Sequence, residues 1–187
     1  GHVQEFYRGI PNCMVIDSRR EDVKRRLVQA FSSDLIRFYY GGDMIGNEVG
    51  AAAKNVVGIA AGFLDGVEMS SLKGALMSRG TREVARLIRA MGGNELSAYW
   101  LCHLGDYEAT VFSPYSHNRQ FGESFIRHQD YHRLAEGYYT VEALMVLSER
   151  YQVELPICRA VHAILYENAD PREQLTELLR RGLRAEF

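Results

Sequence analysis

The pattern of apolar and polar positions changes near residue 42. Before that point, two short runs of apolar and aromatic residues, 13–16 and 36–40, are typical of strands, and the spacing between them predicts a helix over 19–31. Asp17 or Ser18 is expected to cap this helix. The basic residues around Lys24 are expected on its solvated face. Residues 1–42 are therefore predicted to be a short α/β segment.

After residue 42, apolar positions recur at helical spacing nearly to the C-terminus. Helices are predicted over 44–64, 71–79, 81–91, 95–101, 119–128, 140–151, 156–166 and from 171 onward. Thr81 and Thr140 are expected to cap two of them, the glycine pair at 92–93 to stop one, and Asp170 with Pro171 to begin the last. The segment 102–118, rich in Gly, Ser, Pro and His, is predicted to be a loop. Residues 43–187 are therefore predicted to form a mainly α-helical domain.

Composition excludes several classes of protein. In 187 residues, 47% are apolar and 25% charged, the balance of a globular domain, and the net charge of −2 gives no basic surface for nucleic acid. The most apolar stretch, 51–64, is too short to span a bilayer, so neither membrane insertion nor a signal peptide is expected. Three widely spaced cysteines argue against a disulfide framework or a metal site, and favour a cytoplasmic location.

Lys54 is unusual because it lies in the middle of a helix between Gly50 and Gly58, its neighbours four residues away. Another backbone or a ligand could approach it closely there. Two interpretations remain open. In one, Lys54 is a surface lysine that extends along its helix into water. In the other it is buried and acts as a general acid or base.

The segment 104–119 gathers an acid, several hydroxyls, an imidazole, an amide and a guanidinium before a predicted helix. Free N–H groups at a helix start, with Asn118 and Arg119, would suit an anion such as phosphate. The alternative is a polar surface loop with an ordinary cap. The histidines at 103, 128, 132 and 162 show no spacing typical of metal ligands. No Gly-x-Gly-x-x-Gly motif follows a strand, so no nucleotide-binding fingerprint is present.

Four blocks of the sequence, in order, resemble the C-terminal part of NAD(P)-dependent glycerol-3-phosphate dehydrogenases of the bacterial soluble type. They are 46–62 around Lys54-Asn55, 72–80 with Glu83, 104–122 around Leu104-Gly105-Asp106, and 151–158 with Tyr166, Asp170-Pro171 and Glu186. The resemblance implies that 43–187 is a multi-helix substrate-binding and catalytic domain like the C-terminal domain of 6-phosphogluconate dehydrogenase. It implies that 1–42 is the remnant end of a Rossmann-type nucleotide-binding domain.

The resemblance also implies site residues. Lys54 would be the catalytic acid or base, and Asp106 would bind substrate and orient that lysine. The remaining implied residues are Thr110 for the substrate, Ser116, His117 and Asn118 for its phosphate, and His117 and Glu136 for the NAD or NADP cofactor. An ammonium beside the carbonyl carbon suits hydride reduction of a ketone, because it can donate the proton that the developing oxyanion needs.

Two departures from the family pattern shape the functional expectation. The nucleotide-binding half is largely outside this chain, so the chain alone is expected to be inactive, and His117 stands where the family has arginine. The expected function is interconversion of glycerol 3-phosphate and dihydroxyacetone phosphate for phospholipid biosynthesis, by a homodimer. Two alternatives remain open: a non-catalytic helical dimerisation module, and a related hydroxyacid dehydrogenase with another substrate.

Overall fold

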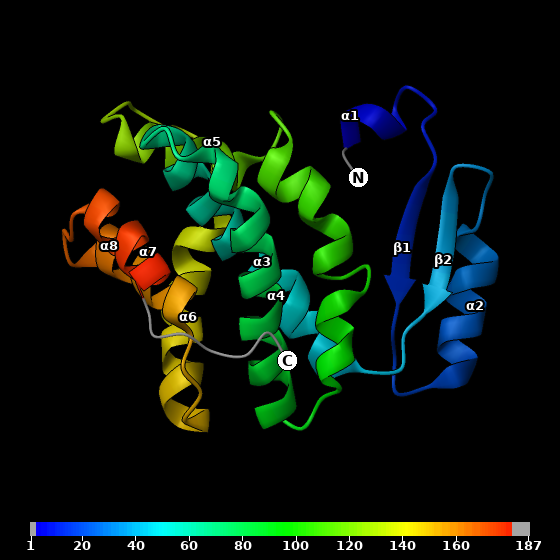
Figure 1. Cartoon of the computed structure of the whole chain (residues 1–187). Helices are drawn as coiled ribbons and strands as arrows, with labels where there is room; N and C mark the ends of the chain where they lie inside the picture. Colours follow the sequence, from blue (N-terminus) through cyan, green and yellow to red (C-terminus); the bar gives the residue numbers. More distant parts are fainter. Residues whose placement is uncertain (1–2, 181–187) are drawn as a thin grey trace.

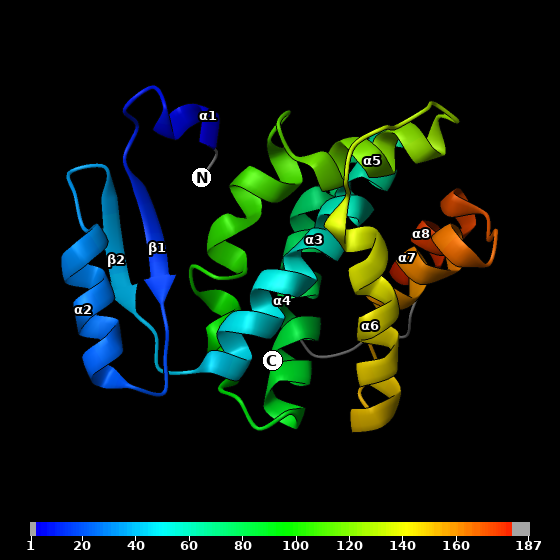
Figure 2. The same ribbon diagram turned by 180° about the vertical axis from the view of Figure 1, so that it is seen from behind.

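The computed structural model describes residues 3–180. Residues 1–2 and 181–187, among them Glu186, lie outside the described part. A small α/β part contains α1 (Val3–Phe6), β1 (Asn12–Ile16), α2 (Glu21–Phe31) and β2 (Ile36–Tyr40), and it lies beside a larger, wholly helical part (Figures 1 and 2). The predicted class, mainly α with a short α/β segment, is confirmed.

The two predicted strands pair in parallel, with Asn12 opposite Ile36 and Ile16 opposite Tyr40. A parallel pair needs a crossover connection, which α2 provides. The prediction that Asp17 or Ser18 caps α2 is wrong, because the helix begins at Glu21 and its N-cap residue makes no side-chain hydrogen bond. Asp17 instead accepts hydrogen bonds from the backbone N–H of Asp43 and the side chain of Asn47, where the chain enters the long helix after β2.

Lys24 is not on a solvated face. Its side chain is 5% exposed, its amine donates to the carbonyl of Gly41 at 2.7 Å, and it pairs with Glu21. The ammonium therefore ties α2 to the segment that leaves β2. The sequence pattern could not reveal this, because Gly41 lies 17 residues away and contributes only a backbone oxygen.

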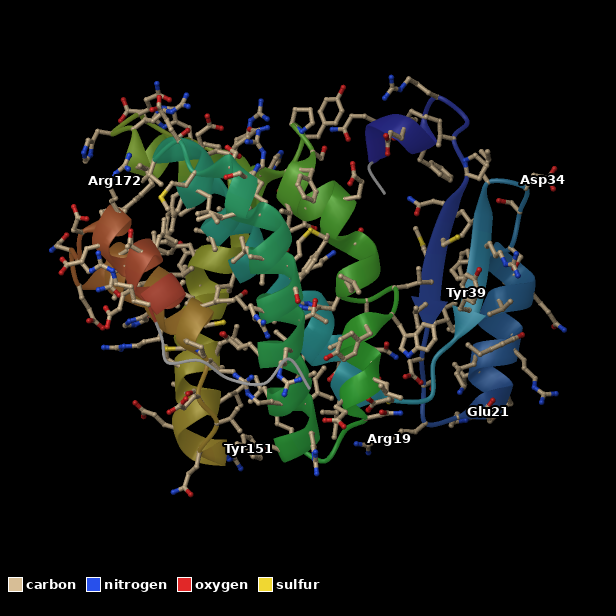
Figure 3. The ribbon with its side chains drawn as sticks, viewed as in Figure 1. Arg19, Glu21, Asp34, Tyr39, Tyr151 and Arg172 are labelled. Atoms are coloured by element: carbon tan, nitrogen blue, oxygen red, sulfur yellow. The ribbon has the colours of Figure 1, made fainter. Side chains whose placement is uncertain are left out.

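Six helices and four single turns make up the described helical part. They are α3 (Met44–Gly66), η1 (Ser70–Leu72), α4 (Lys73–Ala90), η2 (Glu95–Tyr99), η3 (Leu104–Asp106), η4 (Glu108–Phe112), α5 (His117–Ile126), α6 (Glu136–Tyr151), α7 (Pro156–Tyr166) and α8 (Pro171–Arg180). The long helix α3 runs through the middle, with α4, α5 and α6 against it and α7 and α8 on the side away from the strands (Figure 1). Arg172 of α8 donates to the carbonyl of Val67 just after α3 at 2.8 Å, which fixes the last helix (Figure 3).

Helix α3 forms the centre of the hydrophobic core. Val56, Val57, Ile59, Ala60 and Ala61 are all buried to within 1%, and such near-consecutive positions face different sides of the helix. A helix that is apolar nearly all round is a buried one, and its small Ala, Gly and Val residues allow neighbours on several sides. The composition of 44–64 therefore reflects its central position.

Helices α3 and α5 cross at two glycines. A Cβ at Gly62 would overlap the carbonyl oxygen of Arg119, and a Cβ at Gly122 would overlap that of Ile59. Since any side chain would push the backbones apart, these positions need glycine for the observed crossing. This crossing brings the start of α5 beside the middle of α3.

Two predicted helices, 71–79 and 81–91, are one continuous helix, α4. Thr81 does not cap it, because its hydroxyl donates to the carbonyl of Met77 at 2.8 Å, one turn earlier in the same helix. A threonine can satisfy itself within a helix in this way. The predicted stop at 92–93 is confirmed, since α4 ends at Ala90 and Gly92 has a φ of +89°.

The segment 102–118 is not an open loop, because it contains the turns η3 and η4. Tyr107 and Val111, four residues apart, are completely buried there, which is helical spacing that composition concealed. Helix α6 begins at Glu136, one turn before Thr140, whose hydroxyl donates to the Glu136 carbonyl. The predicted start of α8 is confirmed, because Asp170 accepts the N–H of Glu173 at 2.7 Å.

Candidate active site

Lys54 interrupts a row of glycines on α3. Every fourth residue of the helix lies on this row: Gly46, Gly50, Lys54, Gly58, Gly62 and Gly66. The segment 97–126 follows it, so that a Cβ at Gly50 would lie 3.2 Å from the Cβ of His103, and one at Gly58 would lie 2.9 Å from the Thr110 methyl. The close approach expected beside Lys54 is thus made by another part of this chain.

The amine of Lys54 forms an ion pair with the carboxylate of Asp106, from η3. Both side chains are 23% exposed, so the pair lies at the edge of the core and keeps access to water. Of the two interpretations left open for Lys54, this geometry is that of a paired, largely buried lysine. It brings together the two residues that the resemblance names for proton transfer.

Thr110 supports the turn that carries Asp106. Its hydroxyl donates to the Asp106 backbone carbonyl at 2.8 Å, and its side chain is buried against Gly58. This hydrogen bond fixes the backbone one turn after η3. Thr110 therefore contacts Asp106 through the main chain, a contact beyond the substrate-binding role expected for it.

Asn55, Asn118 and Glu136 form a hydrogen-bonded chain across three helices. Asn118 donates to the Asn55 side-chain oxygen at 3.1 Å, and Asn55 donates to the Glu136 carboxylate at 3.1 Å. The Asn118 oxygen accepts the N–H of Gly137 at 2.9 Å, in the first turn of α6. The chain joins α3, α5 and α6 directly beside Lys54. Sequence reasoning gave no role to Asn55, although its place next to Lys54 was a signal.

The first residues of α5 are held in place by hydrogen bonds. Ser116, nearly buried, is the N-cap, and its hydroxyl accepts the N–H of Arg119 at 3.3 Å. His117 is the exposed first residue of α5, and its carbonyl accepts the hydroxyl of Tyr131 at 3.0 Å. The observed cap agrees with the ordinary-cap alternative for Ser116. It also leaves the His117 imidazole at the solvent-facing start of the helix.

Arg119 is not positioned as the anion ligand that the sequence suggested. Its guanidinium donates to Asp65 at 2.6 Å, to Glu123 at 3.1 Å and to the carbonyl of Ser113. Asp65 also accepts hydrogen bonds from Lys73 and Ser70 at 2.6 Å each. Burial raises the pKa of Asp65, but these bonds outweigh burial and leave it below its ordinary value. Arg119 therefore belongs to an ion-pair cluster between α3, α4 and α5.

His103 and Tyr107 form a buried polar pair behind Asp106. His103 Nδ1 lies 2.9 Å from the Gly50 carbonyl oxygen, and the Tyr107 hydroxyl lies 2.6 Å from His103 Nε2. Burial lowers the pKa of His103 to about 4, and the nearby Lys54 charge acts in the same direction. The imidazole is therefore neutral at pH 7. The spacing of His103 in the sequence, which is not that of a metal ligand, gives no signal of this pair.

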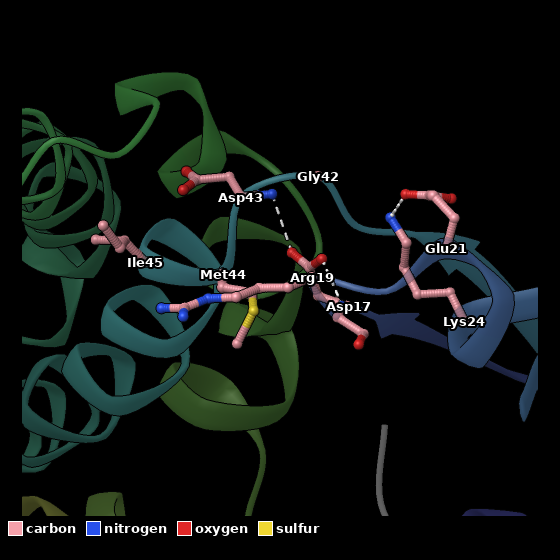
Figure 4. A pocket seen from close by; sticks show the side chains of 9 residues that line it. Asp17, Arg19, Glu21, Lys24, Gly42, Asp43, Met44 and Ile45 are labelled. Carbon is pink, nitrogen blue, oxygen red and sulfur yellow. Dashed lines mark hydrogen bonds and ion pairs between the residues drawn. The ribbon is translucent and has the colours of Figure 1, made fainter.

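A shallow cavity of about 340 Å³ lies where the strands meet the start of α3 (Figure 4). Its lining includes Asp17, Arg19, Lys24 and Asp43. Asp17 accepts the N–H of Asp43 at 2.9 Å and the side-chain N–H of Asn47 at 2.7 Å. The end of β1 is thereby fixed to the first turn of α3.

Two classes of feature are absent from residues 3–180. No three His, Cys, Asp or Glu side chains there are grouped closely enough to hold a metal ion. None of the helices in that range has the length and apolar character needed to cross a bilayer. The three cysteines, all within that range, are unpaired.

The family model and the curated relatives that match this chain all name the same enzyme. Residues 43–176 match the family described as NAD-dependent glycerol-3-phosphate dehydrogenase C-terminus. Among curated proteins, the glycerol-3-phosphate dehydrogenase [NAD(P)+] of Thermus thermophilus is 39% identical over 186 residues, covering 96% of this chain and 58% of that protein. The enzyme of Fusobacterium nucleatum is 34% identical and is likewise covered over 58% of its length. The chain thus spans a little over half the length of the relatives that it matches.

Solved structures agree with this comparison. The crystal structure of glycerol-3-phosphate dehydrogenase from Coxiella burnetii superposes with a TM-score of 0.90 at 30% identity, over 95% of this chain and 57% of that one. The enzyme from Saccharomyces cerevisiae gives a TM-score of 0.79 at 17% identity, over 94% of this chain and 56% of that one, which shows a shared fold.

Proposed function

Since the chain belongs to the NAD-dependent glycerol-3-phosphate dehydrogenase family and contains its C-terminal domain, we propose that it is the substrate-binding and catalytic part of such an enzyme. The reaction is the NAD(P)-linked interconversion of sn-glycerol 3-phosphate and dihydroxyacetone phosphate. The observation that carries the proposal is the ion pair between Lys54 and Asp106, set at the edge of the core where a small metabolite can reach it. The likeness to known dehydrogenases supplies the substrate class.

Lys54 is the proton-transferring group of this proposal. When dihydroxyacetone phosphate is reduced, negative charge develops on the ketone oxygen, and an ammonium within hydrogen-bond reach can stabilise it and donate the proton. Asp106 orients the amine, and Thr110 holds the turn that carries Asp106. In the reverse direction the same amine takes the hydroxyl proton.

The start of α5 is the proposed position of the substrate phosphate. The N-terminus of a helix attracts anions through its free N–H groups. His117 lies there with its side chain exposed, and Ser116 precedes it. Asn118 acts indirectly in this proposal, because its amide holds Asn55 and the first turn of α6.

The residues described here do not make a complete dinucleotide site. No glycine-rich turn follows β1, and Asp17, at the end of that strand, is engaged by Asp43 and Asn47. Glu136 and His117 are the residues that this chain offers toward a nicotinamide dinucleotide, which supplies hydride transfer when it is bound. We therefore propose that the pyrophosphate is held by a polypeptide segment outside residues 3–180, and that the 187-residue chain alone is inactive.

Reconstitution tests the proposal. The chain is co-expressed with the N-terminal part of the Thermus thermophilus relative, the part that it does not span, and NADH oxidation with dihydroxyacetone phosphate is measured. We expect recovered activity, and a decrease of roughly 10²- to 10⁴-fold in Lys54→Ala. Arg89→Ala, which removes an exposed charge from α4, is the control and should retain activity. Activity that survives Lys54→Ala would contradict the role of Lys54, and oxidation by the chain alone would contradict its predicted inactivity.

A second candidate function is a non-catalytic helical module that serves in association. The observation in its favour is His117, because an imidazole at the start of α5 cannot make the two-pronged contact to phosphate that the family's arginine makes. Failure to recover any activity with either phosphorylated or non-phosphorylated substrates would favour this function. Homodimer formation and a cytoplasmic location are proposals that rest on the family, and size-exclusion chromatography with light scattering tests the first.

A further inference from the structure

The buried pair formed by His103 and Tyr107 has no part in the chemistry proposed above. Neither side chain is exposed at all, and their rings meet edge to face with centroids 4.8 Å apart. A backbone carbonyl can only accept a hydrogen bond, so Nδ1 of His103 carries the proton that is donated to Gly50. Nε2 then accepts the Tyr107 hydroxyl. Both nitrogens of the imidazole are thus satisfied inside the core.

The position of this pair relates it to the candidate active site. Asp106 is the last residue of the turn η3, which His103 precedes and Tyr107 follows. Gly50, whose carbonyl accepts the hydrogen bond from His103, lies four residues before Lys54 on α3. The pair therefore connects the segment that carries the carboxylate to the helix that carries the amine.

The segment around Asp106 needs such a connection, because its own local structure is weak. Turn η3 has three residues of 3-10 helix, and such short turns hold their shape through contacts with the rest of the protein. A buried polar group left without its partner costs free energy, so the pair favours one placement of the turn over others. The absence of a side chain at Gly50 lets His103 approach α3 closely enough for the hydrogen bond.

We propose that His103 and Tyr107 are positioning residues, which hold the Asp106 carboxylate against the Lys54 amine by anchoring the turn to the Gly50 carbonyl. Their importance for catalysis rests on the proposed function. Their effect on the ion pair does not, so it is measured without any enzymatic activity.

The three lysines of the chain give a direct measurement. Lys24, Lys54 and Lys73 each pair with a carboxylate, so each amine must leave its partner before it reacts with an acylating reagent. Brief treatment of the full chain with limiting acetic anhydride, followed by peptide mass spectrometry, gives a separate rate for each amine. Asp106→Asn, which removes the partner of Lys54, defines the largest effect expected there.

We expect Tyr107→Phe to raise the acetylation rate of Lys54 by about 2- to 10-fold, as the loss of one buried hydrogen bond would do. Lys24 and Lys73 should keep their wild-type rates. Tyr166→Phe, at the end of α7, is the matched control. It also removes a tyrosine hydroxyl, one that donates to the Tyr138 carbonyl at 2.7 Å. It should leave the Lys54 rate unchanged.

His103 gives a second, graded pair of variants. His103→Leu removes both hydrogen bonds, whereas His103→Asn places an amide N–H where Nδ1–H donates to Gly50. The rate at Lys54 should therefore rise in His103→Leu and return toward the wild-type rate in His103→Asn.

Two results would overturn the proposal. One is an unchanged Lys54 rate in Tyr107→Phe and His103→Leu while Asp106→Asn raises it. The other is an equal rise at all three lysines, which would assign the pair to the stability of the whole fold. A reconstituted enzyme without activity would refute the proposed function, yet leave a Lys54-specific response to Tyr107→Phe as support for positioning.

Discussion

The carboxylate of Glu83, in the middle of α4, accepts the backbone N–H of Ile157 at 2.8 Å, in the first turn of α7. It also accepts the N–H of Cys158 at 3.0 Å. Glu83 is completely buried, so a residue 74 positions earlier in the chain provides the cap of α7. Burial raises the pKa of Glu83, and the two backbone N–H donors act in the opposite direction, because the start of a helix attracts a negative charge.

Replacing this carboxylate should destabilise the fold. In Glu83→Gln one of the two acceptor oxygens becomes an N–H₂ group that faces a backbone donor, and we expect the free energy of unfolding to fall by about 1–3 kcal/mol. Urea unfolding followed by circular dichroism measures it. Glu149→Gln, the same change at an exposed position of α6, should have an effect within about 0.5 kcal/mol. Equal effects of the two variants would show that Glu83 does not stabilise α7.

The neutral His103 should make stability depend on pH. Burial lowers its pKa from 6.5 to about 4, whereas in the unfolded chain the imidazole titrates near 6.5. Between these values the unfolded state binds the proton and the folded state does not, so stability decreases as pH falls through this range. The His103 contribution to this decrease is roughly 3 kcal/mol.

Urea unfolding between pH 4.5 and 7.5 measures this dependence. His103→Asn, which cannot titrate, should lose the His103 part of the slope. His132→Asn alters an exposed histidine and should leave the slope unchanged. Parallel pH profiles for wild type and His103→Asn would contradict a neutral, buried imidazole.

The crossing of α3 and α5 should not tolerate a methyl group. Gly62→Ala places a Cβ against the backbone of α5, so the helices must separate, and we expect a loss of about 1–3 kcal/mol in the free energy of unfolding. Gly74→Ala is the matched control, because nothing lies within 4 Å of a Cβ there. In helix α4 it should stabilise by up to about 1 kcal/mol through helix propensity. Thermal unfolding of both variants compares them, and similar midpoints would contradict the close crossing.

The first residue of α5 should control affinity for phosphate. His117→Arg introduces a permanently charged, planar group that can make two parallel hydrogen bonds to phosphate oxygens, which an imidazole cannot make. We expect inorganic phosphate to bind about 10-fold more tightly, judged from the worth of a charge-assisted hydrogen bond. Isothermal titration calorimetry at pH 8 measures the dissociation constant. Unchanged affinity would place the phosphate site elsewhere.

Much of the fold follows from signals that are local in the sequence. Helix α7 after Pro156, the cap at Asp170 and the stop at Gly92 each depend on residues within one helical turn. The predictions that are wrong concern residues whose partners lie far away in the sequence. Asp17 was expected to cap α2, but its partners Asp43 and Asn47 lie 26 and 30 residues away, so no local pattern distinguishes a cap from a long-range acceptor.

In the candidate site too, the features with local sequence signals are predicted and those that depend on distant partners are not. The glycines around Lys54 predicted a close approach, yet its pairing with Asp106 was expected only from the family resemblance, because the two residues are 52 positions apart. The prediction that Arg119 is an anion ligand is wrong, because its guanidinium pairs with Asp65, which lies 54 positions away in the sequence. His103 carries no signal in the sequence, because its partners are a backbone carbonyl and a tyrosine, and neither belongs to a metal-ligand or catalytic motif.

The glycines on both sides of Lys54 affect how this domain can diverge. Four residues away on either side of the lysine, α3 presents main chain and no side chain, so substitutions elsewhere on the helix leave that contact unchanged. A change at Gly50 or Gly58 is different, because a new methyl group would press on His103 or Thr110 and displace the segment bearing Asp106. Natural variation should therefore accumulate freely on the outer helices, while this one row evolves slowly.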